Sequence, residues 1–441
     1  LLIGSGGSVV VTNGSLGGSF RLNNGTVDFR GGSLLVDQFT WNDTQGTMIF
    51  DNGTLTMRAG MLLTNNTVNI GVSNGQTFNF TMLGGQFLNN ATGTRTVVLG
   101  ATSGATGVVT VSSTVGAAVL ANTENLVVGL NGVGRLILTN AGDAINTYAV
   151  LGSNAGSAGS SVYITGSNSD WSLTTGLSMG GSSGAVSNSL VLTNGGKVTA
   201  NNGTFKIGDV AGQQQVLVSG SGSRMLANTI IFGLDGASNA MTVTNGGEVR
   251  ASGTFSGGSF VVGSNSASVG NMINIYGGRV VATNNSGTGV LDVKGGIVTL
   301  GSNGAIYANT TYIRTNSTLD PVTTGGSVNG NLVIDNGANV LMGTNDFLKV
   351  TGALSNAALI NIFANTNVSG FSGIELVDGY QKVGSGQMVW NFNTTVTASY
   401  FGGLRFTNSD LSSIVDSGDI VVGGAASGMD IAVVSKTYSG T

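Results

Sequence analysis

A recurring unit of about 23–30 residues constrains the fold of this chain more than any other feature. Each copy holds a short apolar strand ending in glycine, a loop of small residues, a second apolar strand, a Thr-Asn-Gly-Gly-like turn and a third short strand. Clear copies are LVLTNGGKVTA at 190–200, MTVTNGGEVRA at 241–251 and INIYGGRVVA at 273–282. A period of this length is typical of proteins built from stacked repeats.

The glycine that ends the first strand sets the period. It occurs at intervals of 29, 23, 28, 28, 25 and 30 residues, at Gly100, Gly129, Gly152, Gly180, Gly208, Gly233 and Gly263. Three short strands and three turns use about this many residues, so we predict coils of three strands that stack in parallel at about 4.8 Å. The turn residues are expected to tolerate positive φ, as Asn and Gly do, at Asn194, Gly195, Asn245 and Gly246. Corner Asn side chains are expected to stack into amide ladders.

The composition supports an all-β chain with many turns. The 441 residues include 75 glycines, and 40% are hydrophobic while only 8% are charged, which does not fit a disordered linker. β-Branched residues favour strands. Proline would remove a hydrogen-bond donor from a strand ladder, and the chain has only Pro321.

The charge pattern and the missing residue types narrow the function. The 16 Lys and Arg residues are scattered, so we expect neither nucleic-acid binding nor polybasic binding to a membrane surface. No stretch of about 18 apolar residues is present, so we expect no direct membrane insertion. The chain has no His and no Cys, which excludes Ser-His-Asp and Cys-His catalysis. The closest carboxylate pairs, Glu375/Asp378 and Asp416/Asp419, are interpreted as turn or surface residues. We therefore predict a chain that is not an enzyme and has no catalytic residue, metal site or cofactor, with incidental Ca²⁺ binding left open.

The Leu-Thr-Asn-Gly-Gly-x-Val-x-Ala signature, preceded by a strand that ends in Gly, resembles the passenger-associated repeats of bacterial autotransporter and haemagglutinin-like proteins. The resemblance covers roughly residues 1–350. It implies a right-handed parallel β-helix displayed at the cell surface as an adhesin, fibre or stalk. The predicted fold is thus a right-handed parallel β-solenoid with a distinct β-rich C-terminal end.

The repeat fades after about residue 350. Eight aromatic residues gather between Phe363 and Phe406, more than the chain average predicts. We therefore divide the chain into β-solenoid repeats at 1–350 and a C-terminal region at 351–441. Two interpretations of that region stay open, a cap on the solenoid and a subunit-docking region.

The predicted function is that of an extracellular structural protein at the cell surface, assembling with copies of itself head to tail into a filament, fibre or matrix. The candidate donor strand for this assembly is Asp430, Ile431, Ala432, Val433 and Val434. The alternative is a monomeric autotransporter-type adhesin stalk that binds surface glycans. For Trp41 and Trp171 this alternative suggests sugar stacking, against packing as the other interpretation. A polysaccharide-active β-helix enzyme is the third and least favoured hypothesis.

Overall fold

The structure is a computed structural model of the 441-residue chain. It describes residues 1–42, 44–64, 67–89, 96–122, 124–253, 259–301, 303–322, 325–343, 346–363, 371–378, 380–384, 386–391, 401–406 and 421–423. The chain divides into two compact units, Leu1–Asn239 and Ala240–Thr441.

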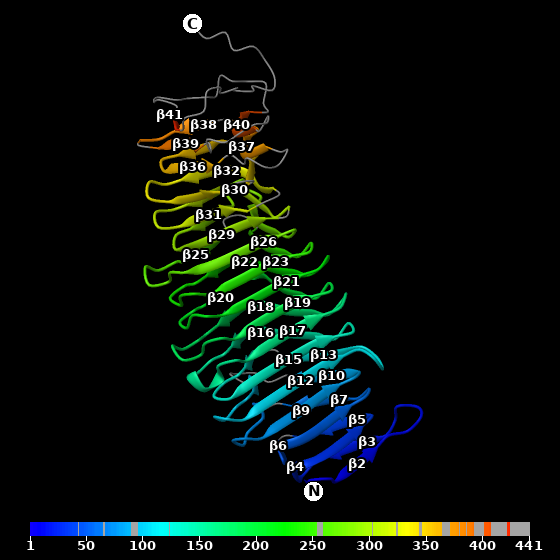
Figure 1. The fold of residues 1–441 in the computed structure, drawn as a ribbon. Helices are drawn as coiled ribbons and strands as arrows, with labels where there is room; N and C mark the ends of the chain where they lie inside the picture. Colours follow the sequence, from blue (N-terminus) through cyan, green and yellow to red (C-terminus); the bar gives the residue numbers. More distant parts are fainter. Residues whose placement is uncertain are drawn as a thin grey trace. The chain divides into compact units, whose positions relative to one another are not determined.

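The predicted parallel β-solenoid is confirmed. The chain is all-β, and its strands pair in parallel over about 13 turns. One coil consists of β12 (Thr106–Ser112), β13 (Ala118–Asn122) and β14 (Asn125–Val128). In the next coil β15 pairs with β12, and the two halves of β16 pair with β13 and β14. Three pairing segments per coil are therefore present, and Figure 1 shows the strands stacked as successive rungs within each unit.

The first unit holds β1 to β22 and one short 3-10 helix, η1. Their bounds are β1 Leu2–Gly4, β2 Ser8–Val11, β3 Ser19–Leu22, β4 Gly25–Val36, β5 Gln38–Trp41, β6 Gly46–Met57, β7 Met61–Thr64, β8 Val68–Ile70, β9 Thr77–Met82, β10 Gly85–Asn89, β11 Thr96–Leu99, β12 to β14 as above, β15 Val133–Thr139, β16 Asp143–Leu151, η1 Ala155–Ser157, β17 Ser161–Thr165, β18 Asp170–Met179, β19 Ser189–Thr193, β20 Lys197–Ile207, β21 Gln215–Ser219 and β22 Arg224–Phe232.

The second unit holds β23 to β41. Their bounds are β23 Ala240–Thr244, β24 Glu248–Gly253, β25 Ser259–Val262, β26 Asn271–Tyr276, β27 Arg279–Asn284, β28 Val290–Val293, β29 Gly296–Gly301, β30 Ala305–Ile313, β31 Thr318–Pro321, β32 Gly326–Ile334, β33 Asn339–Met342, β34 Phe347–Val350, β35 Leu354–Asn356, β36 Leu359–Phe363, β37 Phe371–Leu376, β38 Tyr380–Lys382, β39 Gln387–Asn391, β40 Phe401–Phe406 and β41 Val421–Gly423.

The core consists of side-chain columns that run from coil to coil. Leu138, Ile164, Leu192 and Val218 occupy matching register positions in β15, β17, β19 and β21, and all four are fully buried. Alternation along each strand places their neighbours outside, as the period of two in a strand requires. A coil cannot bury such a face alone, so stacking is what makes the core.

Aromatic packing marks the first coils. Phe29, Phe50 and Phe78 are buried, and Phe78 meets each of the other two rings edge-on at 5.0 Å between centroids. Such edge-to-face pairs add roughly 0.5–1.5 kcal/mol beyond their area burial. The sequence analysis did not identify this Phe cluster, because scattered Phe residues of different coils meet only after stacking.

The strands beyond residue 350 continue the same pairing. β37 pairs in parallel with β34, and β40 pairs in parallel with β37. The boundary between the compact units falls at 239/240, while the proposed boundary at 350/351 and the role of 351–441 as a cap or docking region stay predictions.

Candidate functional site

The strand-ending glycines adopt a left-handed backbone. Their φ angles lie between 64° and 88°, at Gly100, Gly129, Gly152, Gly180, Gly208, Gly233 and Gly263. Glycine adopts this region without the steric cost that a Cβ brings. Each of these residues therefore turns the chain at the end of a strand in a way that other residues rarely do.

Several of these glycines are required for a second reason, because polar side chains pack directly against them. A Cβ on Gly152 would lie 2.1 Å from Asn188 Nδ2, and one on Gly208 would lie 2.3 Å from Asn239 Nδ2. A Cβ on Gly180 would lie 2.7 Å from Gln214 Nε2. The glycine column therefore leaves the space that a column of amide side chains fills.

That amide column runs through consecutive coils of the first unit. Asn188 Oδ1 accepts from the Ser160 backbone N–H at 3.0 Å, and Asn188 Nδ2 donates to Gln214 Oε1 at 3.1 Å and to the Ala185 carbonyl at 2.7 Å. Asn239 Oδ1 accepts from the Gln214 backbone N–H at 3.0 Å. We call Ser160, Asn188, Gln214 and Asn239 the amide ladder, and all four are at most 1% exposed.

The amide ladder satisfies backbone groups that the turns would otherwise leave buried and unpaired. A buried unsatisfied group costs about 1–3 kcal/mol, so each rung fixes both its own turn and the turn of the coil before it. The expectation of stacked corner Asn is thus met at Asn188 and Asn239. In two other coils, Ser160 and Gln214 occupy the ladder position that Asn188 and Asn239 occupy in theirs. The residue type at this position therefore changes from coil to coil, and the sequence alone could not identify the residues of the amide ladder.

The Thr-Asn-Gly-Gly turns place two successive residues at positive φ. Asn194 and Gly195 have φ of 53° and 90°, and Asn245 and Gly246 have φ of 53° and 82°. Asn tolerates this region better than most residues with a Cβ. These turns return the chain into the next strand of the coil.

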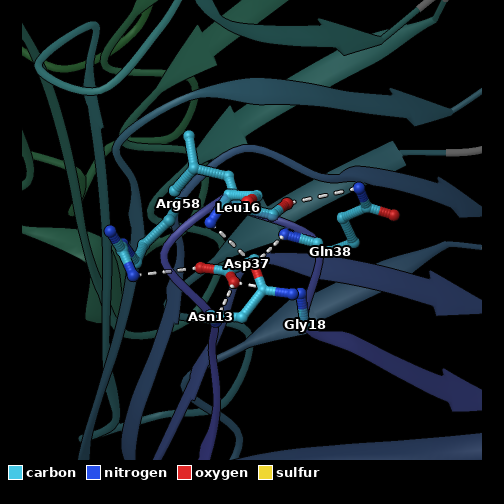
Figure 2. Close-up of polar contacts among 8 residues, drawn as sticks. Asn13, Leu16, Gly18, Asp37, Gln38 and Arg58 are labelled. Atoms are coloured by element: carbon cyan, nitrogen blue, oxygen red, sulfur yellow. Dashed lines mark hydrogen bonds and ion pairs between the residues drawn. The ribbon is translucent and has the colours of Figure 1, made fainter.

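A buried carboxylate fixes the loop between β2 and β3. Asp37 is fully buried, and its Oδ2 accepts from the backbone N–H of Asn13 at 2.7 Å and of Gly18 at 3.0 Å. Its Oδ1 forms an ion pair with Arg58 Nη1 at 3.1 Å, and Gln38 Nε2 donates to the Leu16 carbonyl (Figure 2). The sequence analysis missed this cluster, because Asp37 and Arg58 lie in different coils and neither belongs to a motif.

A second buried carboxylate lies in the second unit. Glu248 is 2% exposed and forms ion pairs with Arg250 Nε at 2.7 Å and with Arg279 of the next coil. Burial acts to raise the pKa of Glu248, but hydrogen bonds and charge attraction from Arg250 and Arg279 outweigh it and leave the pKa below its ordinary value. Both arginines therefore hold this carboxylate ionised.

The acidic residues weighed as candidates are placed as follows. Glu375 forms an ion pair with Lys349 Nζ at 2.9 Å, across paired β34 and β37. Asp416, Asp419 and the candidate donor strand Asp430 to Val434 lie outside the described residues.

Both candidate sugar-stacking tryptophans of the sequence analysis are buried. Trp171 is fully buried and donates through Nε1 to Asn146 Oδ1 at 2.7 Å. Trp41 is 8% exposed and donates through Nε1 to the Gly46 carbonyl at 2.9 Å. These positions favour packing over ligand stacking.

Within the described ranges, no group of three or more Asp, Glu, His or Cys side chains is placed to hold a metal ion. No helix in that part of the chain has the length and apolar character needed to cross a membrane.

Comparisons with known proteins leave the family open. No protein-family model matches the chain, and no curated protein matches it. One similar solved structure is the crystal structure of the TibC-catalyzed hyper-glycosylated TibA55-350 fragment, at 16% identity over 90% of this chain and 97% of that chain. Its TM-score is 0.37, so this likeness carries no argument about the function.

Proposed function

We propose that this chain is an extracellular structural β-solenoid that assembles head to tail into a surface filament, fibre or matrix, and that it is not an enzyme. The observation that carries the proposal is the parallel pairing of coil upon coil. β12, β15, β17, β19 and β21 pair in succession, each through one edge with the coil before and through the other with the coil after.

This interface is directional and can repeat without limit. The forward edge of any coil is complementary to the rear edge of the next, and nothing in the hydrogen-bond pattern requires both coils to belong to one chain. A contact between unlike surfaces of identical subunits generates an open filament. Strand addition would supply main-chain hydrogen bonds at the junction.

The internal construction of the coils fits a structural role. The buried aliphatic columns and the amide ladder run along the stacking direction, so each coil fixes its neighbours. A rigid repeat of this kind is suited to spanning distance, because every repeat contacts only its neighbours.

Negative-stain electron microscopy over a range of protein concentrations tests the proposal. Head-to-tail assembly predicts filaments of uniform width whose length grows with concentration. Single particles that stay separate at every concentration would contradict it and would favour the stalk hypothesis.

One observation favours the second candidate, an adhesin-type stalk that binds glycans. Tyr163 is 38% exposed on the outward face of β17, and its hydroxyl oxygen accepts a hydrogen bond from Thr193 Oγ1 at 3.3 Å. The Thr165 hydroxyl oxygen also lies within hydrogen-bond distance of Thr193 Oγ1, at 3.0 Å. Hydrogen bonds from Thr193 and Thr165 lower the pKa of Tyr163. An exposed ring beside hydroxyl groups offers stacking and hydrogen bonding together, as sugar recognition requires.

A glycan-binding screen of the native chain and of Tyr163→Phe and Tyr163→Ala tests this candidate. Binding that survives in Tyr163→Phe and is lost in Tyr163→Ala supports ring stacking at this face. Binding that is equal in all three proteins, or absent from the native chain, rejects Tyr163 as the glycan contact.

A further inference from the structure

A column of charged residues crosses four coils of the first unit. Asp143, Asp170, Lys197 and Arg224 each open a strand, in β16, β18, β20 and β22. Asp170 pairs in register with Lys197, and Lys197 pairs in register with Arg224. Asp143 precedes Asp170 by one coil, since Ala144 pairs with Trp171. The column therefore reads acid, acid, base, base along the stacking direction.

A second outward column lies beside the charged one, two residues further along each strand. Ile145 pairs with Ser172, Ser172 with Thr199, and Thr199 with Leu226. Ile145 is 49% exposed, although it is a large apolar side chain. This column reads apolar, hydroxyl, hydroxyl, apolar, so it has the same pattern in either direction.

We infer that this two-column strip is a self-association surface, on which a second copy of the chain docks side by side with its stacking direction reversed. A two-fold axis along the strands, between β18 and β20, then relates the copies. It sets Asp143 opposite Arg224 of the partner subunit and Asp170 opposite Lys197 of the partner subunit. Each contact occurs twice, as a two-fold interface requires.

The same axis matches the second column. Ile145 lies opposite Leu226 of the partner subunit, and Ser172 lies opposite Thr199 of the partner subunit. Reversal is required, because a parallel arrangement would set like charges against each other and lose affinity. Both columns are complementary to themselves under the same two-fold axis, and this identifies a second copy of the chain as the partner that docks on the strip.

The two ends of the charged column are available for contacts between chains. No ion pair among the described residues includes Asp143 or Arg224. Asp143 Oδ1 accepts only the Asp170 backbone N–H, at 3.1 Å, in the hydrogen bonds of that part of the chain. Arg224 is exposed. Burial raises the pKa of Asp143, and the nearby Asp170 carboxylate adds to the shift, which indicates a carboxylate short of positive charge.

The strip is small, which determines how the pairing should behave. Four coils at about 4.8 Å span less than ~20 Å. A stable interface usually buries about 800 Å² per partner, so the pairing is expected to be weak and sensitive to salt. Filaments would strengthen it by presenting many strips at once.

Cysteine cross-linking tests the geometry, since the chain has no Cys of its own. Ile145→Cys and Leu226→Cys are prepared separately and treated with a bis-maleimide whose spacer spans roughly 10 Å, the distance between packed sheets. The mixture should give a cross-linked dimer that neither variant gives alone. The yield should fall sharply at about 1 M salt, where the Debye length is ~3 Å.

Two results would overturn the inference. Cross-linking of Ile145→Cys with itself, at a yield equal to that of the mixture, would indicate a parallel or random contact. No cross-link in the mixture at the highest soluble concentration would show that the strip does not dock a second copy.

Charge exchange gives an independent test. Asp143→Lys/Asp170→Lys is combined with Ile145→Cys, and Lys197→Asp/Arg224→Asp is combined with Leu226→Cys. Each column then carries one sign, so each protein should lose any association with itself, while the mixture should cross-link at least as well as the parent pair. Far-UV circular dichroism confirms folding, and if the exchanged proteins do not fold, the single-cysteine experiment alone decides.

The inference does not depend on head-to-tail assembly. Filaments without the cross-link would leave the proposed function intact and reject the lateral contact. The cross-link without filaments would support the lateral contact and reject head-to-tail assembly.

Discussion

Replacing Gly152 by alanine tests the amide ladder most sharply. Gly152 has φ of 76°, and an added Cβ would lie 2.1 Å from Asn188 Nδ2. Asn188 is fully buried, so its side chain has no solvent to move into. We expect Gly152→Ala to displace Asn188 and to break the hydrogen bonds that it makes to neighbouring coils.

The expected cost follows from the groups left without partners. Displacement of Asn188 removes the acceptor of the Ser160 N–H and a donor to Gln214 Oε1. Each buried group left unsatisfied costs about 1–3 kcal/mol, so the ladder loses roughly 2–6 kcal/mol. The left-handed backbone adds about 1–2 kcal/mol for any residue with a Cβ.

Gly159 supplies the matched control. Its φ is 80°, and an added Cβ would meet nothing within 4 Å. Gly159→Ala therefore carries the backbone cost without the displacement. The difference between the two variants isolates the ladder, at roughly 2–6 kcal/mol.

Urea unfolding monitored by far-UV circular dichroism measures the free energy of unfolding of both variants. Because long repeat arrays can unfold in parts, hydrogen exchange of the Ser160 amide provides the local measurement. Gly152→Ala should strip protection from this amide, and Gly159→Ala should leave it. Equal destabilisation by both substitutions, with Ser160 protected in each, would refute the role assigned to the ladder.

Three further predictions concern buried or crowded carboxylates. Asp37→Asn should destabilise the first coils by about 1.5–3 kcal/mol, since the Asn13 and Gly18 N–H groups lose a charged acceptor and the ion pair with Arg58 is lost, and protease cleavage of the loop at 13–18 should accelerate. Asp143→Asn should raise the thermal unfolding midpoint at pH 7 and have no effect below about pH 3.9. The raised folded-state pKa of Asp143 gives stability that is present below the unfolded pKa and is lost as pH rises, and the neutral Asn avoids that loss. Glu248→Gln should lower the midpoint at pH 7, and the loss should vanish in acid: a lowered folded-state pKa gives stability that is present above the unfolded pKa and is lost as pH falls. Thermal unfolding of each unit, monitored by hydrogen exchange at several pH values, measures the stability of all three variants. A pH trend of the opposite sign in Asp143→Asn or Glu248→Gln would reject the pKa shift assigned to that carboxylate.

The repeat made the fold accessible from the sequence. The recurring glycines from Gly100 to Gly263 and the Asn194-Gly195 turn reflect one local requirement, a positive φ at the end of a strand or in a turn, and this requirement recurs in each copy. Such marks depend on neighbours along the chain, so they can be read without a structure.

The polar sites depend on stacking and could not be derived in the same way. Asp37 and Arg58 lie 21 residues apart, and the ladder partners Asn188 and Gln214 lie 26 apart. Loop lengths vary from coil to coil, so the register that brings such residues together is not fixed by their separation. One signal was present: charged residues recur every 27 residues at Asp143, Asp170, Lys197 and Arg224, and aligning the coils on the turn before Lys197 would have revealed the charged column.

Electron cryo-microscopy of the assembled protein at physiological salt tests the central claim most directly. The predicted result is a filament in which strand spacing of about 4.8 Å continues across each subunit boundary, so that the junction is one more coil-to-coil contact. Separate particles at all concentrations, or subunits joined through loops without strand pairing, would contradict the claim.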